Sequence, residues 1–195
     1  MAVNLVKGQK ISLSKESNGL AHLLVGLGWD LPKGLFQKAF DLDAFALVCG
    51  TDGKIDSMRD VVYFANLRHA CGAVNHLGDN LTGAGEGDDE QITIDLTKIP
   101  EKYGKIVLGV CIYLGNERHQ SFDKVKNAFV RLVDTDKNAE ICRYTLSDNS
   151  AFADRYTMVF GEIYRHNGEW KFSAIGEATP DTSITPMFAK PYVRT

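Results

Sequence analysis

Short apolar runs rich in Val, Ile, Phe and Tyr recur along this chain, and Gly, Asn or Asp interrupts them. Such a pattern is typical of an antiparallel β protein with many strands. The run KIVLGVCIYL at residues 105–114 is almost wholly apolar, which favours a strand buried on both of its faces. The predicted fold is therefore all-β, a two-sheet β-sandwich with a few short helical turns.

The strands expected from these runs follow one another with short polar connections. An Asn167-Gly168 pair after the run that ends at His166 predicts a hairpin with a type I′ turn. Helical patterns are confined to residues 99–103 and 122–126, each long enough for about one turn. The expected strands are residues 22–28, 39–49, 61–64, 73–77, 91–96, 105–114, 128–133, 139–146, 156–166 and 169–175.

Length and composition indicate one soluble domain. We expect the sandwich to span residues 1–178, followed by an irregular C-terminal tail, residues 179–195, that holds three of the five prolines. A net charge of −3 and a pI near 5.9 argue against a nucleic-acid-binding protein. No apolar run is long enough for a transmembrane helix, and the N-terminus lacks the apolar stretch of a signal peptide. Cys49 and Cys111 lie in apolar runs, so reduced, buried thiols and a cytoplasmic location are expected.

One segment carries an unusual density of negative charge. Five carboxylates fall within the twelve residues 79–90, which contain no Lys or Arg; we call this segment the glycine-acid loop. Two carboxylates about 5 Å apart repel by roughly 3 kcal/mol at an effective dielectric near 20. A hard divalent cation with oxygen ligands would relieve this repulsion, and Ca²⁺ is the first candidate. The candidate ligands from the loop are Asp79, Asn80, Glu86, Asp88, Asp89 and Glu90.

The loop differs from two familiar motifs. It begins with Asp and ends with Glu as an EF-hand loop does, but Leu81 occupies a ligand position and Ala84 the position of the turn glycine. Its glycines superficially resemble a phosphate-binding loop, yet Asp-Asp-Glu follows them instead of a lysine. The glycines instead allow main-chain carbonyls to turn toward a cation.

A second acidic pair precedes the loop. Strand periodicity places Asp41 and Asp43 on one face, roughly 6–7 Å apart, and Asp30 at the end of the preceding strand is a third carboxylate. These residues either share a cation or form a solvated face on an edge strand. His76, three residues before Asp79, either orients an acidic ligand or is a partly exposed strand residue, and the second interpretation is favoured.

Taken together, these motifs make the chain similar to the TerD family of bacterial stress and tellurite-resistance proteins, across about residues 2–177. The resemblance implies a β-sandwich that binds Ca²⁺, commonly two ions close together, with no settled catalytic activity and with other Ter-type proteins as partners. The matching segments are VGLGWD (25–30), FDLDA (40–44), GDNLTGAGEGDDE (78–90), IDLTKIP (94–100), NAFVRLV (127–133), ICRYTLS (141–147) and FGEIYRHNGEWKF (160–172). Carried over residue by residue, the ligand positions are Asp30, Asp41, Asp43, Asp79, Asn80, Glu86, Asp88, Asp89 and Glu90.

Two functions compete at this stage. The leading hypothesis is a non-catalytic, Ca²⁺-binding stress-response module that acts as a scaffold or sensor. The alternative is a metal-dependent hydrolase that uses the acidic cluster to cleave phosphoesters. The alternative is disfavoured because the loop offers no Lys, Arg or His to stabilise an anion. The scattered basic residues between 102 and 131 are interpreted as a solvated face rather than a nucleic-acid-binding surface. Direct chemistry by the four cysteines is disfavoured because they are dispersed without a recognisable base nearby.

Overall fold

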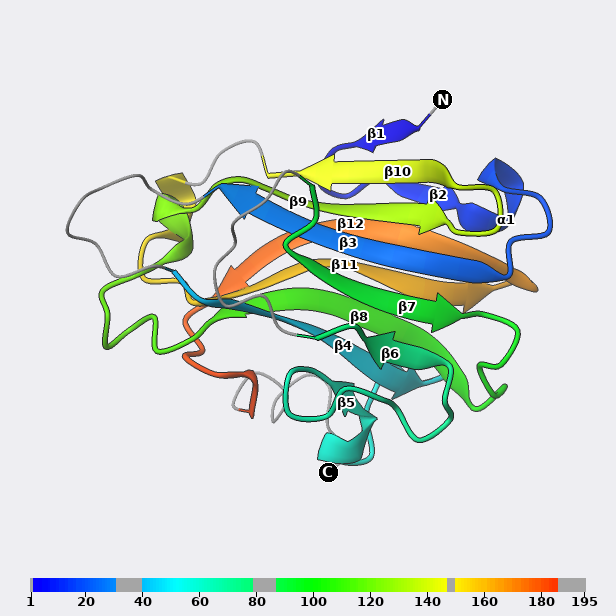
Figure 1. The fold of residues 1–195 in the computed structure, drawn as a ribbon, viewed down its shortest axis with the longest axis horizontal. Helices are drawn as coiled ribbons and strands as arrows, with labels where there is room; N and C mark the ends of the chain where they lie inside the picture. Colours follow the sequence, from blue (N-terminus) through cyan, green and yellow to red (C-terminus); the bar gives the residue numbers. More distant parts are fainter. Residues whose placement is uncertain (1, 31–39, 79–86, 147–149, 186–195) are drawn as a thin grey trace.

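The predicted β-sandwich is confirmed in a computed structural model that describes residues 2–30, 40–78, 87–146 and 150–185. Two six-stranded sheets pack face to face (Figure 1). Sheet A has the order β1-β10-β9-β3-β7-β6, with β1 Val3–Leu5, β3 His22–Asp30, β6 Val74–His76, β7 Glu90–Asp95, β9 Lys126–Asp134 and β10 Ala139–Thr145. Sheet B has the order β2-β12-β11-β8-β4-β5, with β2 Lys10–Ser12, β4 Leu42–Gly50, β5 Val61–Val62, β8 Tyr103–Ile112, β11 Thr157–His166 and β12 Glu169–Thr179.

Sheet B is buried on both of its faces around β4 and β8. Alternate residues such as Ala44 and Val48 face the core between the sheets. The residues between them, such as Phe45 and Leu47, belong to a second apolar cluster, which Ile184 joins from the C-terminal segment. This double burial is the reason why the sequences of β4 and β8 are almost continuously apolar.

The hairpin prediction is confirmed. Asn167 and Gly168 have φ values of 53° and 76°, as a type I′ turn requires, and His166 pairs with Glu169 across it. Within the residues that the structure describes, helical structure is limited to short pieces, as expected. They are α1 Leu13–Glu16, η1 Met58–Asp60, η2 Phe122–Lys124 and η3 Ser150–Phe152.

Two local expectations need correction. Residues 99–103 form a turn rather than a helix: the Tyr103 N–H donates to the Pro100 carbonyl, and β8 starts there. The N-terminal strands β1 and β2 were not expected, because three-residue strands carry almost no periodic signal. Ile184, in the predicted irregular tail, is buried, and the division at residue 178 stays a prediction. Among the described residues, no helix is long and apolar enough to cross a membrane.

Candidate functional site

Several candidate ligands meet at one end of the sandwich, on the left in Figure 1, which we call the acidic end. β3 finishes there at Asp30, and β7 starts there at Glu90, which pairs with Leu27. β4 starts at the same end, where the Ala44 N–H donates to Glu90 Oε2 at 2.5 Å. The antiparallel register therefore gathers residues from three sequence-distant motifs at one end.

Two glycines of β3 make room for the last residues of the glycine-acid loop. A Cβ added to Gly26 would lie 2.2 Å from Asp88 Oδ1, and one added to Gly28 would lie 2.9 Å from the Gly87 carbonyl oxygen. The Asp89 N–H donates to the Leu27 carbonyl at 2.8 Å. The Gly-Leu-Gly pattern of β3 is thus explained: a side chain at Gly26 would collide with Asp88, and one at Gly28 would collide with the Phe129 ring as well as with the loop.

Asp88 is neutralised by a long-range ion pair. Its buried carboxylate receives two hydrogen bonds from Arg131 of β9, from Nε to Oδ1 at 2.6 Å and from Nη2 to Oδ2 at 2.8 Å. Gln91 Nε2 also donates to Oδ2 at 3.0 Å. The hydrogen bonds that Arg131 donates to Asp88 raise the pKa of Arg131, so its guanidinium stays charged. The expectation that Arg131 belongs to a solvated face is therefore wrong.

Glu90 lies inside the sandwich, with a fully buried side chain. Its Oε2 accepts from Ala44 N–H and lies 3.4 Å from His76 Nε2, and that histidine side chain is also fully buried. His76 Nδ1 accepts from the Gly78 N–H at 3.1 Å, which turns the protonated Nε2 toward Glu90. The favoured interpretation of His76 as a partly exposed strand residue is wrong, because Glu90 and His76 share one buried polar site.

Asp30 and Asp89 line a cleft of about 560 Å³, together with Phe129, Arg131 and Arg143. Asp89 Oδ2 accepts from the Trp29 N–H at 2.7 Å, and Asp30 Oδ2 accepts from Asn127 Nδ2 at 2.5 Å. Burial raises the pKa of Asp89, and the like charges of its acidic neighbours, Asp30, Asp88 and Glu90, add to that effect against the single opposing Trp29 hydrogen bond. Its ionised form is therefore disfavoured by the surroundings, which is the situation that a bound cation would reverse.

The other predicted ligands lie elsewhere or outside the described residues. Asp43 is 7% exposed and faces the same side of β4 as the outer cluster of sheet B, so a solvated edge face is wrong for it. The Asp41 carbonyl accepts from Tyr113 N–H at the start of β4. Asp79, Asn80 and Glu86 lie outside the described residues. Across residues 2–30, 40–78, 87–146 and 150–185, no three acidic, His or Cys side chains converge closely enough to hold a metal ion.

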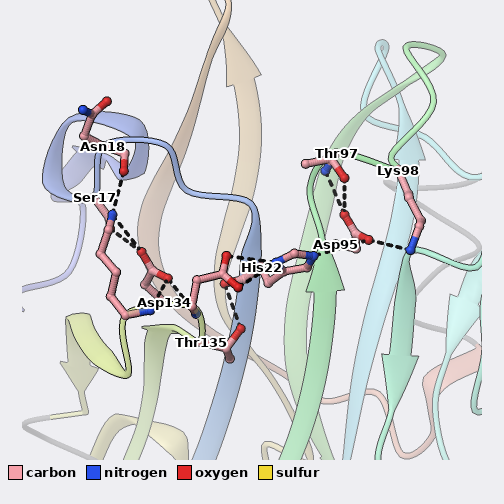
Figure 2. Close-up of polar contacts among 10 residues, drawn as sticks. Ser17, Asn18, His22, Asp95, Thr97, Lys98, Asp134 and Thr135 are labelled. Carbon is pink, nitrogen blue, oxygen red and sulfur yellow. Dashed lines mark hydrogen bonds and ion pairs between the residues drawn. The ribbon is translucent and has the colours of Figure 1, made fainter.

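A second polar cluster occupies the opposite end of sheet A, roughly 25 Å away along β3. Figure 2 shows His22 between two groups of side chains, one around Asp95 and one around Asp134. Lys98 lies 2.8 Å from Asp95, Lys137 lies 3.2 Å from Asp134, and His22 Nδ1 lies 2.9 Å from Asp136. We call this cluster the distal end.

Comparisons with known proteins agree with the motifs of the acidic end. The sequence matches the TerD domain over residues 1–190. The chain belongs to the TerD family. It is 44% identical to the stress response protein SCP2 of Bacillus subtilis (strain 168), over 97% of this chain and 99% of that protein. It is also 44% identical to the tellurium resistance protein TerD of Serratia marcescens, over 91% of each.

A solved TerD homologue from Streptomyces coelicolor A3(2) shares the fold. It superposes with a TM-score of 0.67 at 25% identity and covers 86% of this chain and 95% of its own. The TerD resemblance inferred from the motifs is therefore confirmed, and the match extends into the predicted C-terminal tail.

Sequence reasoning missed the basic residues beside this TerD-family acidic end. Arg143 of β10 donates to Glu140 at 3.0 Å and stacks 4.2 Å from the Phe129 ring centre, and Arg131 reaches Glu140 at 3.2 Å. Alternation along β9 places Phe129 and Arg131 on one face. Only the strand order shows that this face adjoins Asp88 and Asp89, and strand order is not readable from the pattern.

Proposed function

We propose that this TerD-family protein is a Ca²⁺-binding, non-catalytic module that acts as a scaffold or sensor in resistance to tellurite or other chemical stress. The names of its relatives, a tellurium resistance protein and a stress response protein, support the resistance role. The single observation that carries the Ca²⁺ proposal is the pair Asp30 and Asp89 in one cleft, with the pKa of Asp89 raised by burial and by like charges.

The chemistry of the donor set favours a hard cation. The acidic groups at the cleft offer carboxylate oxygens, and Gly87, which also lines the cleft, offers a main-chain carbonyl. Ca²⁺ accepts six to eight such oxygens with flexible geometry, whereas Zn²⁺ favours nitrogen and sulfur. In our proposal, Asp30 and Asp89 bind directly. Asp79, Asn80 and Glu86 complete the coordination of one or two Ca²⁺ ions. Asp41 and Asp43 are further candidate ligands on the side of sheet B.

Asp88 and Glu90 take a different part in this proposal. Their oxygens already accept hydrogen bonds from Arg131 and from Ala44 N–H. They therefore hold the end of the loop against β3 and β4 and set the position of Asp89 between them. Cation binding would neutralise the remaining carboxylate charge and fix the acidic end of the sandwich. Another Ter-type protein could then recognise this ordered surface.

The test is calorimetric titration of Ca²⁺ and Mg²⁺ into metal-stripped protein, with the melting temperature measured in parallel. We expect saturable Ca²⁺ binding, a higher melting temperature and weak Mg²⁺ competition. Asp89→Asn should remove the Ca²⁺-dependent rise in melting temperature. Asp95→Asn, a carboxylate at the other end of the same sheet, is the matched control and should leave it intact. An unchanged Ca²⁺ response in Asp89→Asn would rule out this site.

One observation keeps the hydrolase alternative open. Arg131 and Arg143 line the same cleft as Asp30 and Asp89, so anion-stabilising groups lie beside the acidic cluster after all. Guanidinium groups recognise phosphoryl oxygens through paired hydrogen bonds. Turnover of phosphodiester or nucleotide substrates with Mg²⁺ or Mn²⁺, lost in Arg143→Met and in Asp41→Ala, would establish this function. Absence of turnover with Mg²⁺ and with Mn²⁺ would leave the binding module.

A further inference from the structure

A cysteine and a histidine of the segment between β5 and β6 meet a carboxylate at the end of η1, away from the acidic end. His69, Ala70, Cys71 and Gly72 form a tight turn in which the Gly72 N–H donates to the His69 carbonyl at 2.8 Å. Gly72 has a φ of 72°, which a glycine adopts readily. The turn folds Cys71 back over the ring of His69.

The three side chains contact one another in succession. Cys71 Sγ is 2.9 Å from His69 Nδ1, and His69 Nε2 is 3.3 Å from Asp60 Oδ1. The other oxygen of Asp60 accepts the N–H groups of Asp56 and Ser57, so the carboxylate is fixed at the start of η1. A nucleophile within hydrogen-bond distance of a base, with the base oriented by a third group, is the arrangement that activates side-chain nucleophiles.

The hydrogen bonds determine which ring nitrogen of His69 carries the proton. The Cys71 N–H donates to Nδ1 at 3.2 Å, so Nδ1 is the acceptor and its lone pair faces the turn. Nε2 therefore carries the hydrogen and donates it to Asp60. In this tautomer, the lone pair of Nδ1 is shared by the Cys71 N–H and the Cys71 thiol, so the thiol proton faces the acceptor nitrogen.

The surroundings of His69 keep the ring neutral and fixed. Its side chain is fully buried, and its ring meets the ring of Tyr103 edge-on at 5.0 Å. Burial lowers the pKa of His69, and the charge of Lys102 adds to that effect, while Asp60 opposes it. A neutral imidazole is the form that can take a proton from a thiol.

Cys71 differs from the other three cysteines. Cys49, Cys111 and Cys142 are buried, and burial raises the pKa of their thiols to about 12, 11 and 12. Cys71 is partly exposed. Its limited exposure admits a small co-reactant more readily than a peptide.

We propose that Cys71 is a reactive thiol, with His69 as its base and Asp60 as the positioning residue, and that it reduces small hydroperoxides. His69 Nδ1 takes the thiol proton, and the thiolate sulfur attacks the terminal, hydrogen-bearing oxygen of the hydroperoxide. The S–O bond forms as the O–O bond breaks, and the leaving oxygen takes the proton from His69. Cys71 becomes a sulfenic acid as sulfur loses two electrons, and the hydroperoxide becomes an alcohol, or water when the peroxide is H₂O₂.

The experiment treats full-length protein with H₂O₂, traps sulfenic acid with dimedone and quantifies each cysteine by peptide mass spectrometry. Rates at about pH 7 are divided by rates at about pH 9.5, where ordinary thiols are largely ionised, so that differences in accessibility cancel. We expect this ratio for Cys71 to exceed that of N-acetylcysteine by about tenfold, because a base within hydrogen-bond distance takes the thiol proton at neutral pH. A ratio equal to that of N-acetylcysteine would overturn the proposal.

Asp60→Asn tests the positioning role. The amide can accept the η1 N–H groups through its oxygen while its NH₂ donates to His69 Nε2, which moves the ring proton to Nδ1 and blocks the base. The rate ratio of Cys71 should then fall to that of N-acetylcysteine, with the melting temperature within a few degrees of wild type. If Asp60→Asn fails to fold, His69→Gln gives the same readout. An unchanged ratio in the folded variant would show that the contact is only structural.

Discussion

The two ends of sheet A both carry carboxylates, but in opposite electrostatic situations. At the distal end, Asp95 and Asp134 each have a lysine three residues further along their own turn. Lys98 and Thr97 lower the pKa of Asp95 to about 2. Burial would raise the pKa of Asp134, but Ser17 and Lys137 outweigh it and the net shift is downward. At the acidic end, the pKa of Asp89 is raised instead.

The difference lies in the amino-acid sequence of each turn. The distal turns contain their own cations, so the charge is balanced within a few residues. The glycine-acid loop contains none, and the long-range partner Arg131 neutralises Asp88 while Asp89 keeps a raised pKa. A count of acidic residues therefore does not locate a cation site. The carboxylate charge that the fold leaves uncompensated is the better guide. It favours the proposed cation site at the acidic end over one at the distal end.

Removing the counter-ion of Asp88 should have the largest effect. Arg131→Met keeps the length of the side chain but leaves a buried carboxylate without its cation. Breaking such a pair costs about 3–5 kcal/mol, and the partial exposure of Arg131 places this case near about 3. For a chain of this size, that corresponds to a melting temperature lower by roughly 10 °C. Thermal unfolding of metal-free protein measures it.

Arg143→Met is the matched control for that variant. Arg143 pairs with Glu140 at a more exposed position, so its loss should cost about 1 kcal/mol or less. The double variant Arg131→Met with Asp88→Leu should recover much of the loss, because no buried charge is then left unpaired. Equal losses in Arg131→Met and Arg143→Met would mean that the Asp88 pair adds no stability of its own.

Adding one methyl group to β3 should have the next largest effect. In Gly26→Ala, the new Cβ would meet the Asp88 carboxylate, which Arg131 holds in place. We expect a loss of about 1–3 kcal/mol, as overpacking usually costs, and weaker Ca²⁺ binding by calorimetry. In an Asp88→Ala background the same substitution should cost little, because the obstructing group is gone. A full additive loss in that background would assign the cost to β3 itself.

The β-sandwich could be predicted from local sequence patterns. The shortest strands and the pairings between distant strands could not. The run of β8 is apolar on both faces of the strand, and the Asn167-Gly168 pair favours a tight turn. Each specifies its structure within a few residues. The three-residue strand β1 pairs in parallel with β10, more than 130 residues away in sequence, and its own pattern contains no trace of that pairing. Short strands are defined by their partners rather than by their own periodicity.

The candidate site follows the same rule. Its acidic residues were visible in sequence because they cluster within the loop and in β4. The Asp88–Arg131 pair was invisible, because it depends on β9 lying beside β3. His76 was misjudged because strand alternation predicts a face but not that the neighbouring strand carries Glu90 into the same buried site. His69 and Cys71 are only two residues apart in sequence. Their contact was missed because a turn brings the two side chains together.

The same substitution at the two ends should have opposite signs in metal-free buffer. Asp89→Asn removes a disfavoured charge and should raise stability, whereas Asp95→Asn removes a favoured one and should lower it, each by less than about 1 kcal/mol. Because the folded-state pKa of Asp95 is depressed, its contribution is present above the unfolded value of about 3.9 and is lost as the pH falls through about 2. Urea titrations at several pH values measure both. Equal signs would contradict the electrostatic contrast between the ends.

His22 should give the smallest effect, and it sharpens the comparison further. The hydrogen bond to Asp136 raises the pKa of His22, and the nearby charge of Asp95 acts in the same direction. A raised folded-state pKa adds stability that is fully present below the unfolded value of about 6.5 and is lost as the pH rises through the folded value. His22→Gln should therefore lower the melting temperature at about pH 5.5 and leave it unchanged at about pH 9. Asp136→Asn should remove the same pH dependence, and the double variant should remove no more, since the two residues share one interaction. A loss of equal size at both pH values would show that His22 acts through packing, and that the distal end is balanced by its lysines alone.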